Sequence, residues 1–367
     1  MSELWVVAAG TGGHIFPGVE VAKEIQKIDP DISPLFFGTK NRLEAQIIPE
    51  QGLNFISIPA APWKGKSPIG KIWGLCLILF STIILCLRAL KSPPKACLCV
   101  GGYVSLPIAL VARLFKKPVF LIEPNIEAGA ANKLISKWAQ KAYCAPKSNV
   151  ALQLQCRCEE FGIPTRKHSF PYEIRNKVRK ILFLGGSQGA QSVNNAAIYC
   201  IPDLYKDDPE IQFTIQCGKS HEDEVILQAE KLSMSKNVQV KGFINQISEE
   251  MASSDLVVAR AGAMTLSELS LIGIPSIVIP FPFAADDHQR KNALVLEEQK
   301  ALRVVEESNP SFLKVLSTHL RELCFSEESF FMRKELSENI MKSACPNATG
   351  DIAQDIVDTL VKSSPKS

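Results

Sequence analysis

The stretch that decides the fold is LWVVAAGTGGH, residues 4–14. Its first six residues are apolar and predict a buried strand, and the glycine-rich turn that follows leads into a helical run over residues 19–28. Glycines let the backbone approach a bound oxyanion, and the first N–H groups of a helix attract negative charge. We therefore predict a phosphate-binding turn with His14 beside the bound group. The alternative is a turn that only packs a helix onto a sheet.

The composition favours a two-domain protein without a nucleic-acid partner. The chain has 367 residues, more than one hydrophobic core usually supports. The formal net charge of +3 and the pI near 8.2 leave no large basic surplus. The eleven cysteines are scattered through apolar runs without a secretory signal before them, which predicts reduced thiols in a cytosolic protein. The C-x-C pairs at 97/99 and 156/158 lack further ligands at zinc spacing, so we expect no metal and no cofactor.

Short apolar runs alternate with amphipathic segments along most of the chain. This alternation is typical of an α/β fold with parallel sheets covered on both faces. The strands of a first series are expected at 4–9, 34–37, 96–100, 119–122 and 142–144, and those of a second at 181–184, 211–217, 238–240, 255–259 and 276–280. We predict an N-terminal acceptor and membrane-docking domain over 1–164, a linker over 165–180, a nucleotide-binding domain over 181–345, and a C-terminal helix and tail over 346–367. The two open domains are expected to face each other across a cleft.

An uncharged run of sixteen residues, 72–87, is apolar around nearly the whole helical circumference. It is shorter than the roughly 20 residues that span a bilayer. Lysines and an arginine flank it on both sides, and Lys133, Lys137 and Lys141 form an i, i+4, i+8 stripe. Apolar surface with a basic rim predicts peripheral docking onto an anionic membrane. The alternative is a fully buried core helix.

The second half contains two more turns of the same kind. Strand 181–184 leads into GGSQGA, residues 185–190, where Ser187 adds a hydroxyl donor. Farther on, ARAGAMTLSE occupies residues 259–268 and places Arg260 before a helix and Glu268 one turn past Thr265. A carboxylate at that place can accept hydrogen bonds from both hydroxyls of a ribose. It can equally be a surface or capping charge.

After strand 276–280 comes FPFAADDHQRKNA, residues 281–293. Gln289 and Asn292 are three residues apart and share one helical face, where amides suit the hydroxyls of a sugar. Either can also be a surface amide. Asp286, Asp287 and His288 are metal ligands by type but form no closed set.

Together these motifs resemble one family. GTGGHIFP, GGYVSLP, EPN, AGAANK, GGSQGA, ARAGAMTLSE and DDHQRKNA occur in the order and at about the spacing seen in the MurG-type transferases of bacterial peptidoglycan synthesis. The resemblance covers nearly the whole chain and implies a GT-B fold. It also implies transfer of N-acetylglucosamine from UDP-GlcNAc to the muramyl 4-hydroxyl of undecaprenyl-diphospho-MurNAc-pentapeptide, with inversion and without a metal, at the cytoplasmic face of the inner membrane. Cell shape and division depend on that synthesis.

The resemblance also carries over site residues. It implies donor contacts from Thr11, Gly12, Gly13 and Asn125 in the first domain, and from Ser187, Ile244, Ala263, Met264, Thr265, Leu266, Ser267, Glu268, Gln289 and Asn292 in the second. The backbone of Ile244 would meet uracil and Glu268 the ribose. Inversion needs a base, for which His14 is the first choice and Glu123 the second. Helix N-termini with Arg260 nearby would stabilise the departing diphosphate.

The chain departs from the family pattern at three places. Ile122 and Pro124 flank Glu123 where the family has histidine and glutamine, and Leu106 replaces a glycine. The family's Asn-Pro-Val-Arg in the linker corresponds to residues 171–175 here, which makes Arg175 a shifted stand-in for a donor-contacting arginine. Two alternatives remain open: a UDP-GlcNAc 2-epimerase on the same fold, and a noncatalytic sugar-nucleotide-binding or membrane-recruiting subunit.

Overall fold

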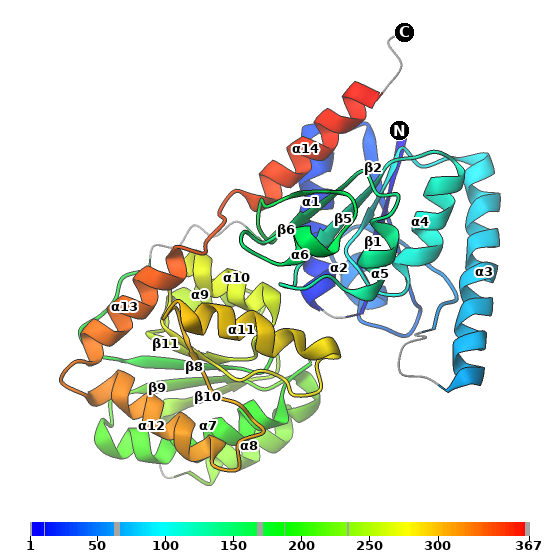
Figure 1. The fold of residues 1–367 in the computed structure, drawn as a ribbon. Helices are drawn as coiled ribbons and strands as arrows, with labels where there is room; N and C mark the ends of the chain where they lie inside the picture. Colours follow the sequence, from blue (N-terminus) through cyan, green and yellow to red (C-terminus); the bar gives the residue numbers. More distant parts are fainter. Residues whose placement is uncertain are drawn as a thin grey trace. The chain divides into compact units, whose positions relative to one another are not determined.

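The computed structural model describes residues 2–10, 12–61, 67–166, 172–186, 188–232 and 235–363. The chain divides into two compact units. The first comprises residues 1–166 together with 345–367, and the second comprises residues 167–344. Each unit is an α/β layer structure with a parallel sheet, which confirms the predicted fold class (Figure 1).

The first unit contains a seven-stranded sheet in the order β3-β2-β1-β4-β5-β6-β7. The strands are β1 (Ser2–Val7), β2 (Ile32–Gly38), β3 (Asn54–Ser57), β4 (Ala96–Cys99), β5 (Val119–Glu123), β6 (Lys141–Cys144) and β7 (Arg157–Glu159). The helices are α1 (Gly12–Ile28), α2 (Glu44–Glu50), α3 (Pro68–Lys91), α4 (Ser105–Leu114), α5 (Ala130–Ile135), α6 (Val150–Gln153) and α14 (Ala348–Ser363). The strand order reverses between β1 and β4, and ligands of open α/β sheets bind at such a switch point, beyond the carboxyl ends of the strands.

Strand β1 is apolar on both faces because helices cover both faces of its sheet. Trp5 and Val7 belong to one hydrophobic cluster, which α3 and α4 complete, whereas Leu4 and Val6 belong to the cluster under α1 and α14. Figure 1 shows these helix pairs on opposite sides of the strands. The continuous apolar run over residues 4–9 is thus the signature of a central parallel strand.

The second unit contains a six-stranded sheet in the order β10-β9-β8-β11-β12-β13. The strands are β8 (Lys180–Leu184), β9 (Gln212–Gln216), β10 (Val238–Lys241), β11 (Leu256–Ala259), β12 (Ser276–Val278) and β13 (Arg303–Val304). The helices are α7 (Gln191–Asp207), α8 (Glu222–Glu230), α9 (Ile247–Ala252), α10 (Ala263–Ile272), α11 (His288–Glu298), α12 (Phe312–Phe325) and α13 (Ser329–Met341), with short 3-10 turns at η1 (Lys219–His221), η2 (Ser235–Asn237) and η3 (Ala285–Asp287). Here the order reverses between β8 and β11.

The C-terminal helix α14 is part of the first unit, where it packs against α1 (Figure 1). The carboxylate of Asp355 accepts hydrogen bonds from Lys141 Nζ and Tyr143 Oη, each at 2.8 Å. Lys141 is therefore a residue of β6 with an internal partner, and the expected lysine stripe does not form, because α5 already ends at Ile135.

The described part of the expected linker, from Tyr172 onward, packs within the second unit. The buried carboxylate of Asp255 accepts the backbone N–H groups of Arg179 and Lys180 at 2.7 and 2.9 Å, and its other oxygen pairs with Arg175 Nη1 at 3.1 Å. Asp255 precedes β11 and Lys180 begins β8, so these contacts lie at the amino ends of the strands.

Helix α3 is longer than the sixteen-residue run that predicted it. Its segment Ile72–Lys91 has a mean hydropathy of 2.2 and is long and apolar enough, by length and composition, to cross a membrane. One face packs on the first unit through Ile78, Leu85 and Ala89, and Arg88 pairs with Glu3 at 2.6 Å. The opposite face is exposed, so the alternative of a fully buried core helix is wrong.

Candidate functional site

In the first unit, three loops meet at the carboxyl edge of the sheet, after β1, β4 and β5. Gly10 after β1 and Gly101 after β4 have φ of +111° and +108°, which L side chains rarely adopt. Gly12 and Gly13 open helix α1, and His14 lies on its first turn with a partly exposed side chain. Thr11 lies outside the described residues. The structure therefore places the glycine-rich turn and His14 where the sequence predicts them.

Gly101 provides the space that the His14 ring occupies. A Cβ atom built on Gly101 would lie 3.2 Å from His14 Cδ2, 3.4 Å from His14 Nε2 and 3.6 Å from Asn132 Nδ2. The histidine ring and the Asn132 amide thus both lie close to this backbone position, whose φ of +108° also favours glycine. Sequence reasoning missed Gly101 and Asn132 as site residues, although both lie in motifs that it used.

Glu123 ends β5 and is only 2% exposed. One carboxylate oxygen accepts the backbone N–H and the side-chain amide of Asn125 at 3.2 and 3.1 Å, and the other accepts Gly129 N–H and Asn132 Nδ2 at 2.8 and 2.9 Å. Burial raises the pKa of this carboxyl group, and the four hydrogen bonds act in the opposite direction. Glu123 therefore holds the loop that carries Asn125 and Asn132, an arrangement that suits positioning better than proton abstraction.

The Asn132 amide is fully oriented by these contacts. Its Nδ2 also donates to the Ile122 carbonyl at 3.1 Å, and its Oδ1 is buried without a hydrogen-bond partner in the described part of the chain. Unpaired buried polar atoms are rare in folded proteins. The Oδ1 atom is therefore a buried acceptor whose amide is fixed in orientation by the Nδ2 contacts.

In the second unit, the turn after β8 is built for close backbone contact. Gly185 N–H donates to Gln216 O at 3.0 Å, and a Cβ atom on Gly189, whose φ is +78°, would lie 2.1 Å from Cys217 O. A Cβ on Gly186 would meet nothing within 4 Å. The turn is thus packed against β9 on one side and open at Gly186. Ser187 lies outside the described residues.

Helix α10 follows β11, and β11 is the neighbour of β8 in the sheet. Its N-cap is Gly262, which supplies no side-chain hydrogen bond to the first turn, so the N–H groups of the first turn have no capping side chain. The side chains of Ala263, Met264 and Leu266 are buried, whereas Thr265, Ser267 and Glu268 are partly exposed. The first three can therefore meet a ligand only through their backbone, and the last three can use their side chains.

Ile244 lies beyond the carboxyl end of β10 and lines a pocket of about 460 Å³. The other lining residues are Lys241, Phe243, Asn245, Gln246, Glu249, Glu250 and Ser253. Cavities of this volume are common for small-molecule sites. The position of Ile244 agrees with a base-binding role, which stays a prediction.

Helix α11 carries the two predicted amides. Gln289 Oε1 accepts the backbone N–H of Phe281 at 3.0 Å, and Asn292 is 6% exposed. Asp286 and Asp287 precede the helix with φ of +54° and +57°, a strained pair of conformations for residues with side chains. Within the described ranges, no group of three His, Cys, Asp or Glu side chains is arranged to hold a metal ion.

Two predicted basic residues have other partners. Arg175 is at the amino ends of the strands, where it pairs with Asp255, because its segment continues into β8 from that end. The Arg260 guanidinium is 13% exposed and forms an ion pair with Glu307 at 2.7 Å. The structure therefore does not bring Arg175 to the carboxyl edge, and it engages the charge of Arg260 internally.

Comparisons with known proteins agree with this arrangement. Residues 4–144 match the glycosyltransferase family 28 N-terminal domain, and residues 180–347 match the C-terminal domain of the same family. The UDP-N-acetylglucosamine–N-acetylmuramyl-(pentapeptide) pyrophosphoryl-undecaprenol N-acetylglucosamine transferase of Pelobacter propionicus is 33% identical over 82% of this chain and 85% of its own length. The transferase of the same name from Bacteroides thetaiotaomicron is 32% identical over 96% of both chains. The crystal structure of Acinetobacter baumannii MurG superposes with a TM-score of 0.76 at 26% identity, covering 98% of this chain and 100% of that one.

The chain belongs to the MurG family. It is accordingly a glycosyltransferase of GT-B type that uses a UDP-sugar. A putative UDP-N-acetylglucosamine 2-epimerase from Listeria monocytogenes has a TM-score of 0.66 at 12% identity, a likeness of fold alone. Membership of the MurG family favours the transferase over the epimerase and over a noncatalytic subunit.

Proposed function

We propose that this protein transfers N-acetylglucosamine from UDP-GlcNAc to the 4-hydroxyl of the muramyl sugar in undecaprenyl-diphospho-MurNAc-pentapeptide. The observation that carries the proposal is membership of a family whose curated relatives are named for this reaction and match nearly the whole chain. The two glycine turns and the α10 N-terminus agree with a UDP-sugar donor. The reaction belongs to peptidoglycan synthesis, and through it to cell shape and division.

The chemical step needs one proton acceptor and one anion-stabilising group. The muramyl hydroxyl oxygen attacks C1 of the donor sugar, its proton passes to the base, and the bond from C1 to the UDP oxygen breaks with inversion. The leaving group departs with an additional negative charge. The N–H groups at the start of α10 can stabilise that charge, because no side chain caps them.

We assign His14 as the base. Its ring lies on the first turn of α1, partly exposed, beside Gly101 and Asn132. Glu123 is fully buried and accepts four hydrogen bonds, so proton abstraction by it would require the loop to open. Glu123 and Asn132 position the loop instead.

The function is tested by incubating the purified protein with radiolabelled UDP-GlcNAc and the lipid-linked muramyl pentapeptide. We expect label in the lipid fraction, and digestion of the product should show a β-1,4 linkage. UDP-GlcNAc hydrolysis or epimerisation without lipid labelling would contradict the proposal. Binding of UDP-GlcNAc without turnover would favour a noncatalytic subunit.

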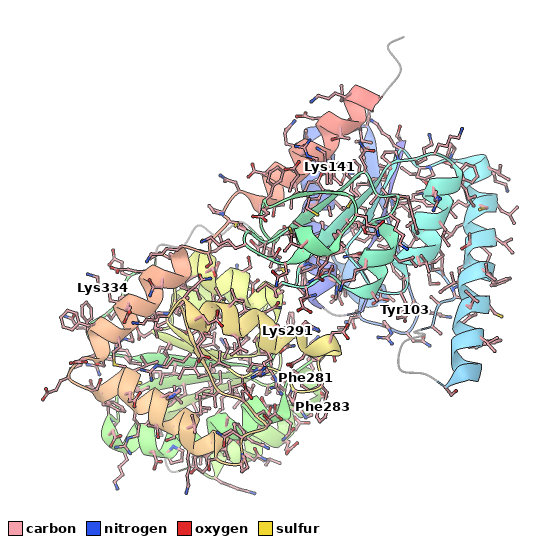
Figure 2. The ribbon with its side chains drawn as sticks, viewed as in Figure 1. Tyr103, Lys141, Phe281, Phe283, Lys291 and Lys334 are labelled. Carbon is pink, nitrogen blue, oxygen red and sulfur yellow. The ribbon has the colours of Figure 1, made fainter. Side chains whose placement is uncertain are left out.

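We further propose that α3 docks on the cytoplasmic face of the inner membrane. Its outer face exposes Ile72, Trp73, Leu75, Leu79, Phe80, Ile83, Leu87 and Leu90, each at least half exposed. Figure 2 shows the side chains on this face pointing away from the unit. Lys91 adds positive charge to the last turn of the helix, while the charge of Arg88 is paired with Glu3.

Contact along the surface agrees better with the structure than a membrane crossing. The inner face of α3 packs on the first unit, with Ile78 and Leu85 at 2% and 1% exposure and Ser81 Oγ donating to the Pro59 carbonyl. A helix fixed in this way can bury only its outer face in lipid.

The net charge of +3 gives no reason to expect a nucleic-acid partner.

Replacing Leu79 and Phe80 together with serine should weaken membrane binding. Because both side chains are more than half exposed, their removal should lower binding to phosphatidylglycerol vesicles at least about tenfold with little effect on folding. Vesicle sedimentation measures the change. The matched control is Leu152→Ser, since Leu152 is 88% exposed on α6. Equal binding of the double variant and the control would refute docking through this face.

A further inference from the structure

Arg260 is the centre of a closed network in the second unit. It follows β11 and precedes the α10 N-cap by two residues. Its Nη1 donates to Glu307 Oε2 at 2.7 Å and to the carbonyls of Ile279 and Pro280, each at 3.2 Å. Hydrogen bonds between ionised partners are among the stronger ones in proteins. The guanidinium therefore ties the turn after β11 to the end of β12.

The other side of the same guanidinium reaches α7. Arg260 Nη2 and Ser192 Oγ are 2.6 Å apart, and Ser192 Oγ lies 3.0 Å from Glu307 Oε2, to which it donates. Ser192 is the second residue of α7, directly after the turn at residues 185–190. The network thus reaches the first turn of α7 through Ser192, while Glu307 compensates the charge of Arg260.

Phe281 extends the network to Gln289. The Arg260 Cζ atom lies 5.3 Å from the centre of the Phe281 ring, within the range of a cation–π contact. The Phe281 N–H donates to Gln289 Oε1 at 3.0 Å. Because that bond uses the amide oxygen, the end of the Gln289 amide that remains for a ligand is the NH₂ group, a donor.

The loop that carries Phe281 contains an exposed aromatic side chain and two residues with strained backbone conformations. It contains the exposed Phe283, whose ring lies 5.7 Å from that of Phe281, and it ends in Asp286 and Asp287 with positive φ. Figure 2 shows the two phenylalanines beside each other on the same loop. Two consecutive strained residues persist only where surrounding contacts hold them. Asp287 has such contacts in Ala284 and Arg290, while Arg260 contacts the start of the loop at Phe281.

We propose that Arg260 is a positioning residue that orients Gln289 for the sugar of the donor, rather than a ligand of the diphosphate. The inference rests on the proposed function. It adds which residues make the affinity for UDP-GlcNAc differ from the affinity for UDP. Gln289 recognises a hydrogen-bond acceptor on the sugar, such as a hydroxyl or acetamido oxygen. Glu307 and Ser192, which hold Arg260, contribute to sugar recognition without touching the donor.

The test compares Arg260→Met, Glu307→Gln and Ser192→Ala by titration calorimetry with UDP-GlcNAc, UDP and uridine. We expect affinity for UDP-GlcNAc to fall about tenfold in the first two variants and less in the third, with UDP affinity within about threefold of the unmodified protein. Arg260→Met combined with Glu307→Gln should be no worse than either alone, because both act through one network. The conservative Ser192→Ala variant keeps the experiment informative if Arg260→Met does not fold.

The control is Arg303→Met, which breaks another partly buried arginine–glutamate pair, with Glu322 at 2.6 Å. It should lower the melting temperature without changing the ratio of the UDP-GlcNAc and UDP affinities. In the ligand-free protein, amide hydrogen exchange of residues 279–289 should accelerate in Arg260→Met and Glu307→Gln but not in Arg303→Met.

Two results would overturn the inference while leaving the proposed function intact. In the first, Arg260→Met binds UDP more weakly while its affinity for uridine is unchanged, and Glu307→Gln shows no such loss. Arg260 would then bind the diphosphate directly. The other is an unchanged affinity ratio and unchanged exchange in both variants. If the unmodified protein binds neither UDP nor UDP-GlcNAc, the proposed function fails and the inference fails with it.

Discussion

His14→Ala is expected to lower kcat by about 10²- to 10⁴-fold, the usual contribution of a general base, with affinity for UDP within about threefold. The reason is that the imidazole accepts a proton only as the muramyl hydroxyl attacks, so its removal affects the transition state far more than donor binding. Lipid-labelling kinetics and UDP titration measure the two quantities separately. His14→Gln should be as slow as His14→Ala, because an amide fills the space without accepting the proton.

The matched control is His319→Ala, which removes an imidazole from α12 in the second unit. It should leave kcat within about threefold of the original value, since α12 carries none of the predicted site residues. If His14→Ala kept more than about a tenth of the turnover, His14 would not be the base. Glu123 would then have to be tested, despite the four hydrogen bonds that it accepts.

Gly189→Ala is expected to destabilise the second unit by about 2–4 kcal/mol and to weaken UDP binding. A Cβ atom there would lie 2.1 Å from Cys217 O, and φ is +78°. The left-handed conformation alone costs an L residue about 1–2 kcal/mol, and forcing the turn away from β9 adds an overpacking cost of similar size. Urea unfolding measures the stability, and calorimetry measures the UDP affinity.

Gly186→Ala is the matched control for this prediction. Its φ of +81° is nearly the same, but a Cβ atom there would meet nothing within 4 Å. Only the conformational cost should remain, so its loss of stability should be smaller by about 2 kcal/mol. Equal losses for the two variants would show that the close approach to Cys217 does not determine the geometry of the turn.

The central strands of both sheets and the edge strand β10 could be predicted from the sequence, whereas the other three edge strands could not. β1 and β8 lie next to the switch points and are apolar on both faces, so periodicity alone reveals them. The edge strands β3, β7 and β13 are absent from the predicted series. They are two to four residues long and only partly buried, so they leave little hydrophobic pattern to detect.

The candidate site likewise has features that the sequence predicts and contacts that it does not. The glycine turns and the helix N-termini are local features, since a turn and the helix after it are contiguous in the chain, and the structure places them as predicted. The partners of Arg260 and Arg175 are not local, whereas those of Glu123 lie within the nine residues that follow it. Glu307 is 47 residues from Arg260, and Asp255 is 80 residues from Arg175. No spacing rule predicts such pairs, so two arginines expected at the donor are held by carboxylates instead.

By itself, the sequence determined that the chain forms parallel α/β domains with glycine turns before helices, because burial on both faces of a strand and backbone access to an anion each require particular residues in a short segment. Only the tertiary structure decided which charged groups remain available to a ligand. A guanidinium or carboxylate takes whichever partners the fold brings within hydrogen-bond distance. For Arg260 the carboxylate partner is Glu307, 47 residues farther along the chain, whereas Glu123 is held by the loop that directly follows it.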